Sequence, residues 1–293
     1  MLDNHKKTQT FGYSGLARLS DLETKEWKEL FAILEKDQKA FTEREDQILS
    51  PEYKWQRNPL HNWSRIWEYP YVYHQIKTWR EKIGAAAPPR VLDVGSGVTF
   101  FPFSIAMLGC HVTCTDIDPV CEKDLRRAIR IIPHTPGRLD FKLTDGSSLP
   151  FADGEVDAVY CISVLEHIPA FDKMLEEIAR VLAPEGLFVL TVDLDMSDDF
   201  QLGIKEYKRL TALLQRHFDY LYPQISIHPA DILHSASGPY AEKRHNWFDM
   251  ASIFLKQRIV KPLLGRSPGK VRFHPVAVEG AVMIKKLTDN FCY

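Results

Sequence analysis

Three acidic residues lie in or directly after apolar runs, where their carboxylates could accept hydrogen bonds from a bound ligand. Asp93 lies within "VLDVGSG", Asp116 ends "HVTCTD" and Asp145 ends "LDFKLTD". An acid at the end of a second strand can bind ribose hydroxyls when a Gly-rich turn follows the first strand. Asp116 follows Gly95 by roughly 20 residues, the spacing expected for that arrangement. The pattern predicts a site for a nucleoside-containing ligand.

The Gly-rich segment separates two classes of such ligands. Gly95, Ser96 and Gly97 form a G-x-G pattern directly after an apolar run. A dinucleotide-binding fingerprint needs a third glycine at position 100, where the helix packs close to the pyrophosphate, and this chain has Phe100 there. The sequence therefore disfavours NAD, although the glycines and the acid still favour a nucleoside ligand.

One histidine is placed to act as a general base. His167 lies in "VLEHIP", directly after a predicted strand, so it belongs to the sheet edge where open α/β folds bind ligands. Its unperturbed pKa near 6.5 suits proton abstraction at neutral pH. The alternative is a histidine that orders the loop before Pro169, with Glu166 as its neighbour. Three later histidines are further candidates: His228, His234 and His245.

The elements that position these residues alternate in type from residue 90 onward. β-Branched runs predict strands, and apolar residues at helical spacing predict helices. The predicted strands are 90–95, 111–117, 139–145, 156–163 and 186–194, with a closing pair at 270–286 that turns near Glu279 and Gly280. The predicted helices are 100–109, 119–130, 170–183 and 202–218. This alternation predicts a parallel sheet covered by helices on both faces.

The remainder of the chain divides into an extension and an insert. We predict an N-terminal helical, aromatic-rich extension or lid over residues 1–85 and a main domain over residues 86–293. Within the main domain, about residues 234–270 are longer than most connections and are predicted to be inserted. The first helix of the extension is expected to begin at Ser20, which forms a capping-box pattern with Glu23.

Aromatic residues are concentrated at 51–79, interleaved with charged residues that include Arg65 and Glu68. Aromatic side chains supply large buried areas, so one interpretation is a helical layer packed onto the core. The other is a lid whose rings, with Arg65 or Glu68, enclose a ligand. Both interpretations place this stretch against the main domain.

Taken together, the motifs of residues 88–195 resemble the class I S-adenosylmethionine-dependent methyltransferases. The shared patterns are D-x-G-x-G, then V-x-x-x-D, then D-x-x-x-L-P-F-x-D-x-x-x-D, then V-L-E-H. The resemblance implies a Rossmann-like α/β fold with a mostly parallel seven-stranded sheet and helices on both faces. It also implies S-adenosylmethionine as cofactor. By the same resemblance, Asp93, Gly95, Ser96 and Gly97 would form the turn around the methionine moiety.

The resemblance implies roles for five more residues. Asp116 would bind the ribose hydroxyls, and Ile117 would lie against the adenine. Asp145, with the backbone at Gly146, would recognise the adenine edge. Ser163 would lie near the methionine portion. For Asp93 a bracing role in the turn is an alternative, and Asp118 is as well explained as a helix cap.

Charge and cysteine content limit the expected partners and location. The formal net charge of −2 gives no basic field for a nucleic-acid duplex, so no nucleic-acid partner is expected. The five cysteines form no C-x-x-C pair and are interpreted as reduced thiols in a cytoplasmic protein. The acids of "DLDMSDD" at 193–199 are more typical of a solvated turn than of a metal site, so no metal is expected.

Residues 242–272 are rich in Lys and Arg and carry apolar residues that could form one face of a helix. Such a basic amphipathic segment could touch a membrane surface or a partner, and it could equally cap the substrate pocket or a homodimer interface. If its charges meet the substrate, the acceptor would be anionic, such as a carboxylate, a phosphate or an acidic sugar.

These observations lead to one functional hypothesis with two alternatives. The protein is expected to be an enzyme that methylates a small-molecule or glycan-type acceptor, at oxygen, with His167 as the candidate base. The first alternative is an enzyme that acts on a macromolecule or a membrane-associated glycoconjugate. The second is a partner subunit that binds the cofactor without catalysis.

Overall fold

The computed structural model describes residues 10–84, 87–195, 202–242, 255, 261 and 275–287. Its strands are β1 (Gly15–Leu16), β2 (Arg90–Val94), β3 (His111–Asp116), β4 (Arg138–Leu143), β5 (Val156–Ile162), β6 (Leu182–Leu194), β7 (Phe218–Tyr220) and β8 (Ala277–Lys285). Its α-helices are α1 (Lys25–Thr42), α2 (Glu45–Ile48), α3 (Arg65–Ile83), α4 (Phe101–Met107), α5 (Pro119–Ile131), α6 (Phe171–Val181) and α7 (Ile204–His217). Short 3₁₀ turns are η1 (Leu19–Glu23), η2 (Pro59–His61), η3 (Leu165–His167) and η4 (Pro229–Asp231).

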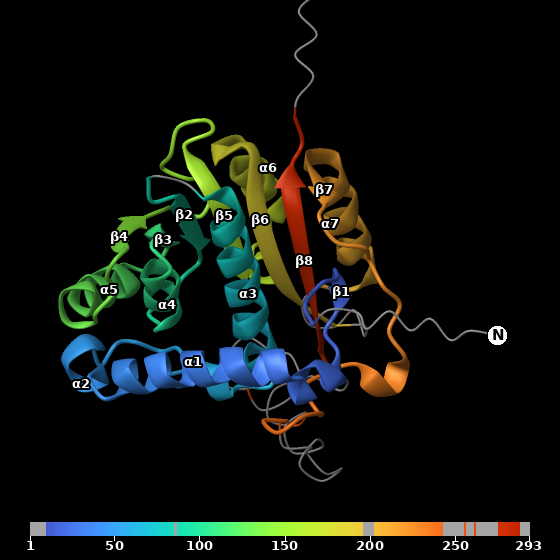
Figure 1. Ribbon diagram of the computed structural model, residues 1–293, viewed down its shortest axis with the longest axis horizontal. Coiled ribbons are helices and arrows are strands. Elements are labelled where there is room, and N and C mark those ends of the chain that lie inside the picture. The colour runs from blue at the N-terminus through green and yellow to red at the C-terminus, as the bar shows by residue number, and fades with distance from the viewer. Residues whose placement is uncertain are drawn as a thin grey trace, which may run out of the picture.

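The strands form one mostly parallel sheet in the order β1-β8-β6-β5-β2-β3-β4, and β7 also pairs with β8 (Figure 1). Strands β2 to β6 pair in parallel, whereas β8 runs antiparallel to β6. The predicted α/β class with a parallel core is confirmed. The sheet has eight strands where seven are expected, because the two short strands β1 and β7, which the sequence does not predict, both pair with β8.

The prediction of a closing strand pair that turns near Glu279 and Gly280 is wrong. Both residues lie inside the single strand β8, where Gly280 pairs with Thr191 of β6. A Cβ at Gly280 would lie only 2.7 Å from the Tyr71 ring, so glycine is needed there for close packing, not for a turn. The buried Glu279 is accommodated because the Tyr207 hydroxyl donates a hydrogen bond to it at 2.9 Å.

Alternate residues of the strands point into two separate hydrophobic cores. Val91 of β2, Ala158 of β5 and Val189 of β6 face the layer that contains α1, α3, α4 and α5. Their neighbours Leu92 and Val159 face the layer that contains α6 and α7. This period of two on strands buried on both faces is what a parallel sheet between two helical layers requires.

The first long helix begins later than the sequence suggests. The capping-box prediction for Ser20 and Glu23 is wrong, because Thr24 is the N-cap of α1 and its hydroxyl accepts a hydrogen bond from the Trp27 amide at 3.2 Å. Ser20 lies in the preceding 3₁₀ turn, where its backbone amide and hydroxyl both donate to the carboxylate of Asp231, each at 2.8 Å. Both Ser20 and Thr24 are residue types that can cap a helix, and the sequence does not show that Ser20 bonds instead to a residue far along the chain.

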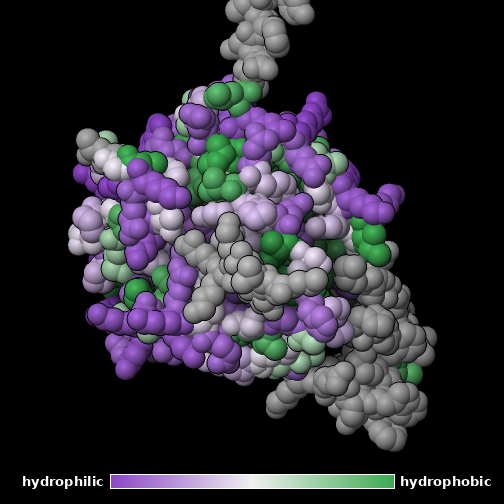
Figure 2. All heavy atoms as spheres, turned by 45° about the vertical axis from the view of Figure 1, so that its right-hand side comes forward, coloured by the Kyte–Doolittle hydropathy of each residue, from purple (hydrophilic) through white to green (hydrophobic). Residues whose placement is uncertain are grey.

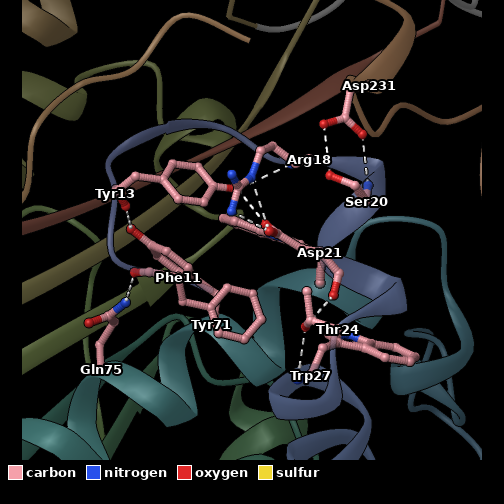
Figure 3. A network of polar contacts seen from close by, with 11 residues as sticks. Phe11, Tyr13, Arg18, Ser20, Asp21, Thr24, Trp27, Tyr71, Gln75 and Asp231 are labelled. Carbon is pink, nitrogen blue, oxygen red and sulfur yellow. Dashed lines mark hydrogen bonds and ion pairs between the residues drawn. The ribbon is translucent and has the colours of Figure 1, made fainter. Parts of the chain in front are cut away.

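A buried carboxylate ties the N-terminal segment to α3 (Figure 3). Asp21 accepts hydrogen bonds from the Tyr13 hydroxyl at 2.5 Å and from the Trp67 indole at 2.9 Å, and it pairs with Arg18 at 2.7 Å. The Tyr71 hydroxyl donates to the Tyr13 carbonyl at 3.0 Å. Since Trp67 and Tyr71 are one turn apart on α3, the segment and this helix are held as one unit.

Hydrophobic residues are dispersed over part of the surface (Figure 2). On the face shown in Figure 2, hydrophobic residues lie in separate groups among hydrophilic ones. None of the helices in the described part of the chain combines the length and the hydrophobicity that crossing a bilayer requires. Most of the basic segment 242–272 and of the predicted insert lies outside the described residues, and the division of the chain at residue 85 stays a prediction.

Candidate functional site

The Gly-rich turn after β2 has the conformation that only glycines adopt readily. Gly95 and Gly97 have φ values of 72° and 54°, and the backbone amides of Gly95 and Ser96 both donate to the Thr115 carbonyl of β3, at 2.9 and 3.0 Å. A Cβ on Gly95 would lie 2.6 Å from the side chain of Val164. The turn is therefore packed directly against the chain that leaves β5.

Tyr53, from the loop between α2 and α3, covers this turn. Its hydroxyl lies 3.2 Å from both the amide and the carbonyl of Val98, accepting from the first and donating to the second. A Cβ on Gly97 would lie 3.6 Å from the same hydroxyl. Further along the extension, Tyr69 stacks on Phe101 of α4, with ring centroids 4.5 Å apart. The aromatic stretch thus packs onto the core and also contacts the Gly-rich turn.

Asp116 closes the turn from the end of β3. One carboxylate oxygen accepts the Gly97 amide at 3.0 Å and the other accepts the Asp118 amide at 2.9 Å. A carboxylate has about four acceptor positions, so each oxygen can still accept a ligand hydroxyl. Ile117 follows with 66% of its surface exposed. An acid such as Asp116 that can accept two ribose hydroxyls, next to the exposed apolar side chain of Ile117, is compatible with a nucleoside ligand.

Asp145 and Gly146 lie in the loop after β4. The Asp145 carboxylate accepts the amides of Ser147 and Ser148 at 2.8 and 3.2 Å, and these hydrogen bonds hold its pKa below the ordinary value. Gly146 has a φ of 77°, and a Cβ there would lie 3.1 Å from the Ile117 side chain. The structure therefore brings Gly146 and Ile117 together, as the adenine-binding prediction requires.

Asp93 is buried beneath the turn. The Tyr160 hydroxyl of β5 donates to it at 2.9 Å, and the two residues are direct partners in the parallel β2–β5 register. Burial, with a smaller contribution from the charge of Asp116, raises the pKa of Asp93 to about 8. The Asp93 carboxyl is hydrogen-bonded by a phenol, so its contact differs from the expected bracing of the turn through backbone amides.

Ser163 is the point at which α3 reaches the sheet. It follows β5 with a φ of 47°, unusual for a residue other than glycine. Its hydroxyl donates to the carboxylate of Glu68 at 2.6 Å, and the Thr191 hydroxyl of β6 donates to the same oxygen at 2.5 Å. Glu68 is fully buried. One carboxylate from the extension thereby joins the carboxyl ends of two strands.

Arg65, one turn before Glu68 on α3, completes this cluster. Its Nη1 forms an ion pair with Glu68 and donates to the Ser163 hydroxyl at 2.8 Å. The Arg65 side chain is 24% exposed, whereas that of Glu68 has no exposed surface. The guanidinium is therefore anchored through Nη1, and part of the Arg65 side chain is exposed.

His167 and Glu166 lie just beyond, in the 3₁₀ turn after β5. One Glu166 oxygen accepts the Asp193 amide at 3.0 Å, and burial, with the charge of Asp193, raises the pKa of Glu166 well above the ordinary value. The His167 side chain is exposed on one side. Its pKa is lowered by the part of the ring that is shielded from water and by the positive charge of Arg65. With a lowered pKa the imidazole is largely neutral at pH 7 and can accept a proton, as a general base must. The assignment of His167 as that base stays a prediction.

The other histidine candidates differ in what the structure says of them. In His228 and His234 the Nδ1 atom accepts a backbone amide two residues ahead, at 3.3 and 3.2 Å, so both order turns. His245 lies outside the described residues. Asp118 is the N-cap of α5, where its carboxylate accepts the Val120 amide at 2.8 Å, as the helix-cap interpretation predicts.

Two residues of the site were not singled out from the sequence. Tyr160 and Thr191 lie inside apolar strands, and nothing in their spacing marks them as polar partners of Asp93 and Glu68. For Tyr160 the missing signal is strand register, since it and Asp93 are partners in adjacent parallel strands and point to the same face. For Thr191 it is the packing of α3 against β6, which brings Glu68 to its hydroxyl. Register is known only once the sheet order is known.

The central part of the chain is similar in sequence to known methyltransferases. Residues 92–190 match the family model described as a methyltransferase domain. The chain is 30% identical over 158 residues to the sterol 4-C-methyltransferase strm-1 of Caenorhabditis elegans, covering 54% of this chain and 45% of that protein. It is 36% identical over 110 residues to the human thiol S-methyltransferase TMT1A, covering 37% of this chain and 44% of that protein.

Among solved structures, the cyclase SpnF aligns with a TM-score of 0.48 and 16% identity, covering 88% of this chain and 96% of that chain. The chain spans less than half the length of the two named sequence relatives. The matched segment runs from β2 to β6, so it contains the Gly-rich turn, the acids after β3 and β4, and Ser163. Arg65 and Glu68 lie outside it.

Proposed function

We propose, starting from the class I S-adenosylmethionine-dependent methyltransferase domain that residues 92–190 form, that the whole protein is an enzyme that methylates a small molecule. The observation that carries the proposal is the Gly-rich turn closed by Asp116, which accepts the Gly97 amide at 3.0 Å beside the exposed Ile117. Together with the family match, this arrangement supports a nucleoside-containing methyl donor over a dinucleotide.

The chain's own residues would bind and orient the donor. Asp116 would accept the ribose hydroxyls, Ile117 and Gly146 would contact the adenine, and Asp145 would recognise its edge. Gly95 and Gly97, with Ser96 and Asp93, would surround the methionyl part near Ser163. When bound, S-adenosylmethionine supplies a methyl group already activated by a sulfonium. The protein must therefore chiefly align the acceptor and remove a proton where the acceptor requires it.

We propose His167 as the residue that removes this proton. Its lowered pKa keeps the imidazole neutral at pH 7, and it lies on the same sheet edge as Ser163. His167→Ala is expected to lower turnover by roughly 10²–10⁴-fold, the usual range for a general base, while the affinity for the donor stays within about twofold. His228→Ala is the matched control, because His228 orders an exposed turn. Undiminished turnover in His167→Ala would remove this residue from the mechanism.

The acceptor is proposed at the level of class. The names of two sequence relatives, a sterol 4-C-methyltransferase and a thiol S-methyltransferase, support a small-molecule acceptor. We keep oxygen as the proposed methylated atom, although those names refer to carbon and sulfur. The cytoplasmic location is likewise proposed, and the free thiols of the four described cysteines agree with it. Docking on a glycoconjugate, a membrane surface or a second copy through 242–272 remains the alternative.

Calorimetric titration tests the cofactor proposal directly. The purified protein is titrated with S-adenosylmethionine and, separately, with NADH. Saturable binding of the first without binding of the second is expected. Conversion of the bound donor to S-adenosylhomocysteine in the presence of candidate acceptors then separates an enzyme from a cofactor-binding subunit. No binding of S-adenosylmethionine would overturn the proposed function while leaving the α/β fold unchanged.

A further inference from the structure

One edge of the Arg65 guanidinium makes no hydrogen bond to the described residues. The hydrogen bonds that the structure gives this guanidinium all start from Nη1 and reach Ser64, Glu68 and Ser163. Within the described ranges, the Nε and Nη2 groups donate to no protein atom. These two groups form one side of the planar guanidinium, and two parallel N–H donors on one side match the two oxygens of a carboxylate.

The contact between Arg65 and Ser163 places this edge near the Gly-rich turn. Nη1 is 2.8 Å from the Ser163 hydroxyl, and the next residue, Val164, is packed against the Gly95 backbone of the Gly-rich turn. Arg65 is therefore separated from the turn by the two residues that follow β5. The Arg65 side chain as a whole keeps 24% of its surface exposed.

The Arg65 guanidinium is held by more contacts than an exposed ion pair provides. Glu68 is fully buried and takes hydrogen bonds from Ser163 and Thr191 besides the Arg65 pair, so the guanidinium is attached to two strands at once. Ser163 also adopts the left-handed φ of 47° while making these contacts. Strained backbone that the surroundings maintain is concentrated at ligand-binding sites. This rigidity fixes the direction of the free edge before any ligand arrives.

We propose that Arg65, which lies outside the matched methyltransferase segment, binds the carboxylate of the donor's methionyl group through Nε and Nη2. The inference rests on the proposed function, because it takes the donor to be S-adenosylmethionine. It assigns the N-terminal extension a direct part in donor binding. A ligand carboxylate on the outer edge and Glu68 on the inner side would place the guanidinium between two anions.

The test compares two ligands that differ by one carboxylate. S-Adenosylhomocysteine and its decarboxylated analogue, which keeps the amine, are titrated calorimetrically into wild type and Arg65→Met. We expect the substitution to weaken S-adenosylhomocysteine at least about tenfold more than the analogue, since hydrogen bonds to charged groups are typically worth that factor or more. Equal weakening of both ligands, or of neither, would overturn the assignment.

Two further variants keep the test decisive. Arg90→Met removes an arginine paired with Asp157 at the amino end of the sheet, and the ratio between the two ligands should stay unchanged. If Arg65→Met alone does not fold, the double variant Arg65→Met/Glu68→Gln avoids an unpaired buried charge and keeps acceptors for Ser163 and Thr191. The same preferential loss is expected there. Wild type that binds neither ligand would instead refute the proposed function.

Discussion

The two ends of the sheet each carry an arginine–carboxylate pair, and the pairs differ in burial. At the carboxyl end, Arg65 meets the fully buried Glu68, which also receives hydroxyl groups from two strands. At the amino end, Arg90 and Asp157 pair at 3.1 Å with 51% and 33% of their side chains exposed. Exposed pairs contribute about 0–1 kcal/mol, whereas a broken buried pair leaves an uncompensated charge. Of these two pairs, the one whose loss should cost more is thus at the edge where the ligand is expected.

The largest effect is expected when the buried pair is broken from the acidic side. Glu68→Ala leaves Arg65 without its carboxylate and the hydroxyls of Ser163 and Thr191 without their acceptor. The free energy of unfolding should fall by about 3–5 kcal/mol, measured by denaturant titration. Glu68→Gln should cost less, because its amide oxygen still accepts hydrogen bonds. A loss below about 1 kcal/mol in Glu68→Ala would contradict the difference drawn between the two ends.

Two aspartates at opposite ends of the sheet should differ in their effect on ligand affinity. Each accepts a backbone amide, Asp116 from Gly97 at 3.0 Å and Asp157 from Arg90 at 2.7 Å, but they do so at opposite ends of the sheet. Asp116→Ala should weaken binding of S-adenosylhomocysteine by about 1–3 kcal/mol in calorimetry, because acceptors for the ribose hydroxyls are lost. Asp157→Ala should leave the affinity unchanged. Equal effects of both substitutions would reject the placement of the ribose.

Asp93 tests a buried carboxyl that has a phenol for a partner in place of a cation. Burial raises its pKa to about 8, so the folded protein keeps a proton that the unfolded chain releases above pH of about 4. Raising the pH through this window therefore favours unfolding. The free energy of unfolding of wild type, relative to Asp93→Asn, should fall by about 1 kcal/mol between pH 6 and pH 7. Parallel stability curves for the two proteins would show that Asp93 is already ionised.

The parallel core of the fold was predictable from sequence, and the reason is local. Strands buried on both faces appear as continuous apolar runs, and Pro119 after Asp118 marks the start of α5 as expected. The prediction for strand β8 is wrong because a glutamate followed by a glycine, here Glu279 and Gly280, is a pattern that also occurs in turns. Their actual partners, Tyr207 and Tyr71, are distant in sequence, so no local pattern could supply them.

The site residues, too, could be predicted only where a local pattern was sufficient. The Gly-rich turn, Asp116 and Gly146 could be placed, because each follows a strand whose carboxyl end must lie at one sheet edge. The partners Tyr160 and Thr191 could not, because the first depends on strand register and the second on how α3 packs against the sheet. For Arg65 the sequence indicates only that it or Glu68 could help a lid enclose a ligand, without a partner in the main domain. The contact of Arg65 with Ser163 joins residues 98 positions apart.

The smallest effect is expected at the amino end of the sheet. Arg90→Met removes the exposed side-chain pair but keeps the hydrogen bond from the backbone amide of residue 90 to Asp157. The free energy of unfolding should change by no more than about 1 kcal/mol, and the change should shrink in 1 M salt, where the screening length is only about 3 Å. The Glu68→Ala loss should persist in the same salt, because buried charges are screened much less. A salt-insensitive loss above about 2 kcal/mol in Arg90→Met would mean that exposure does not separate the two pairs.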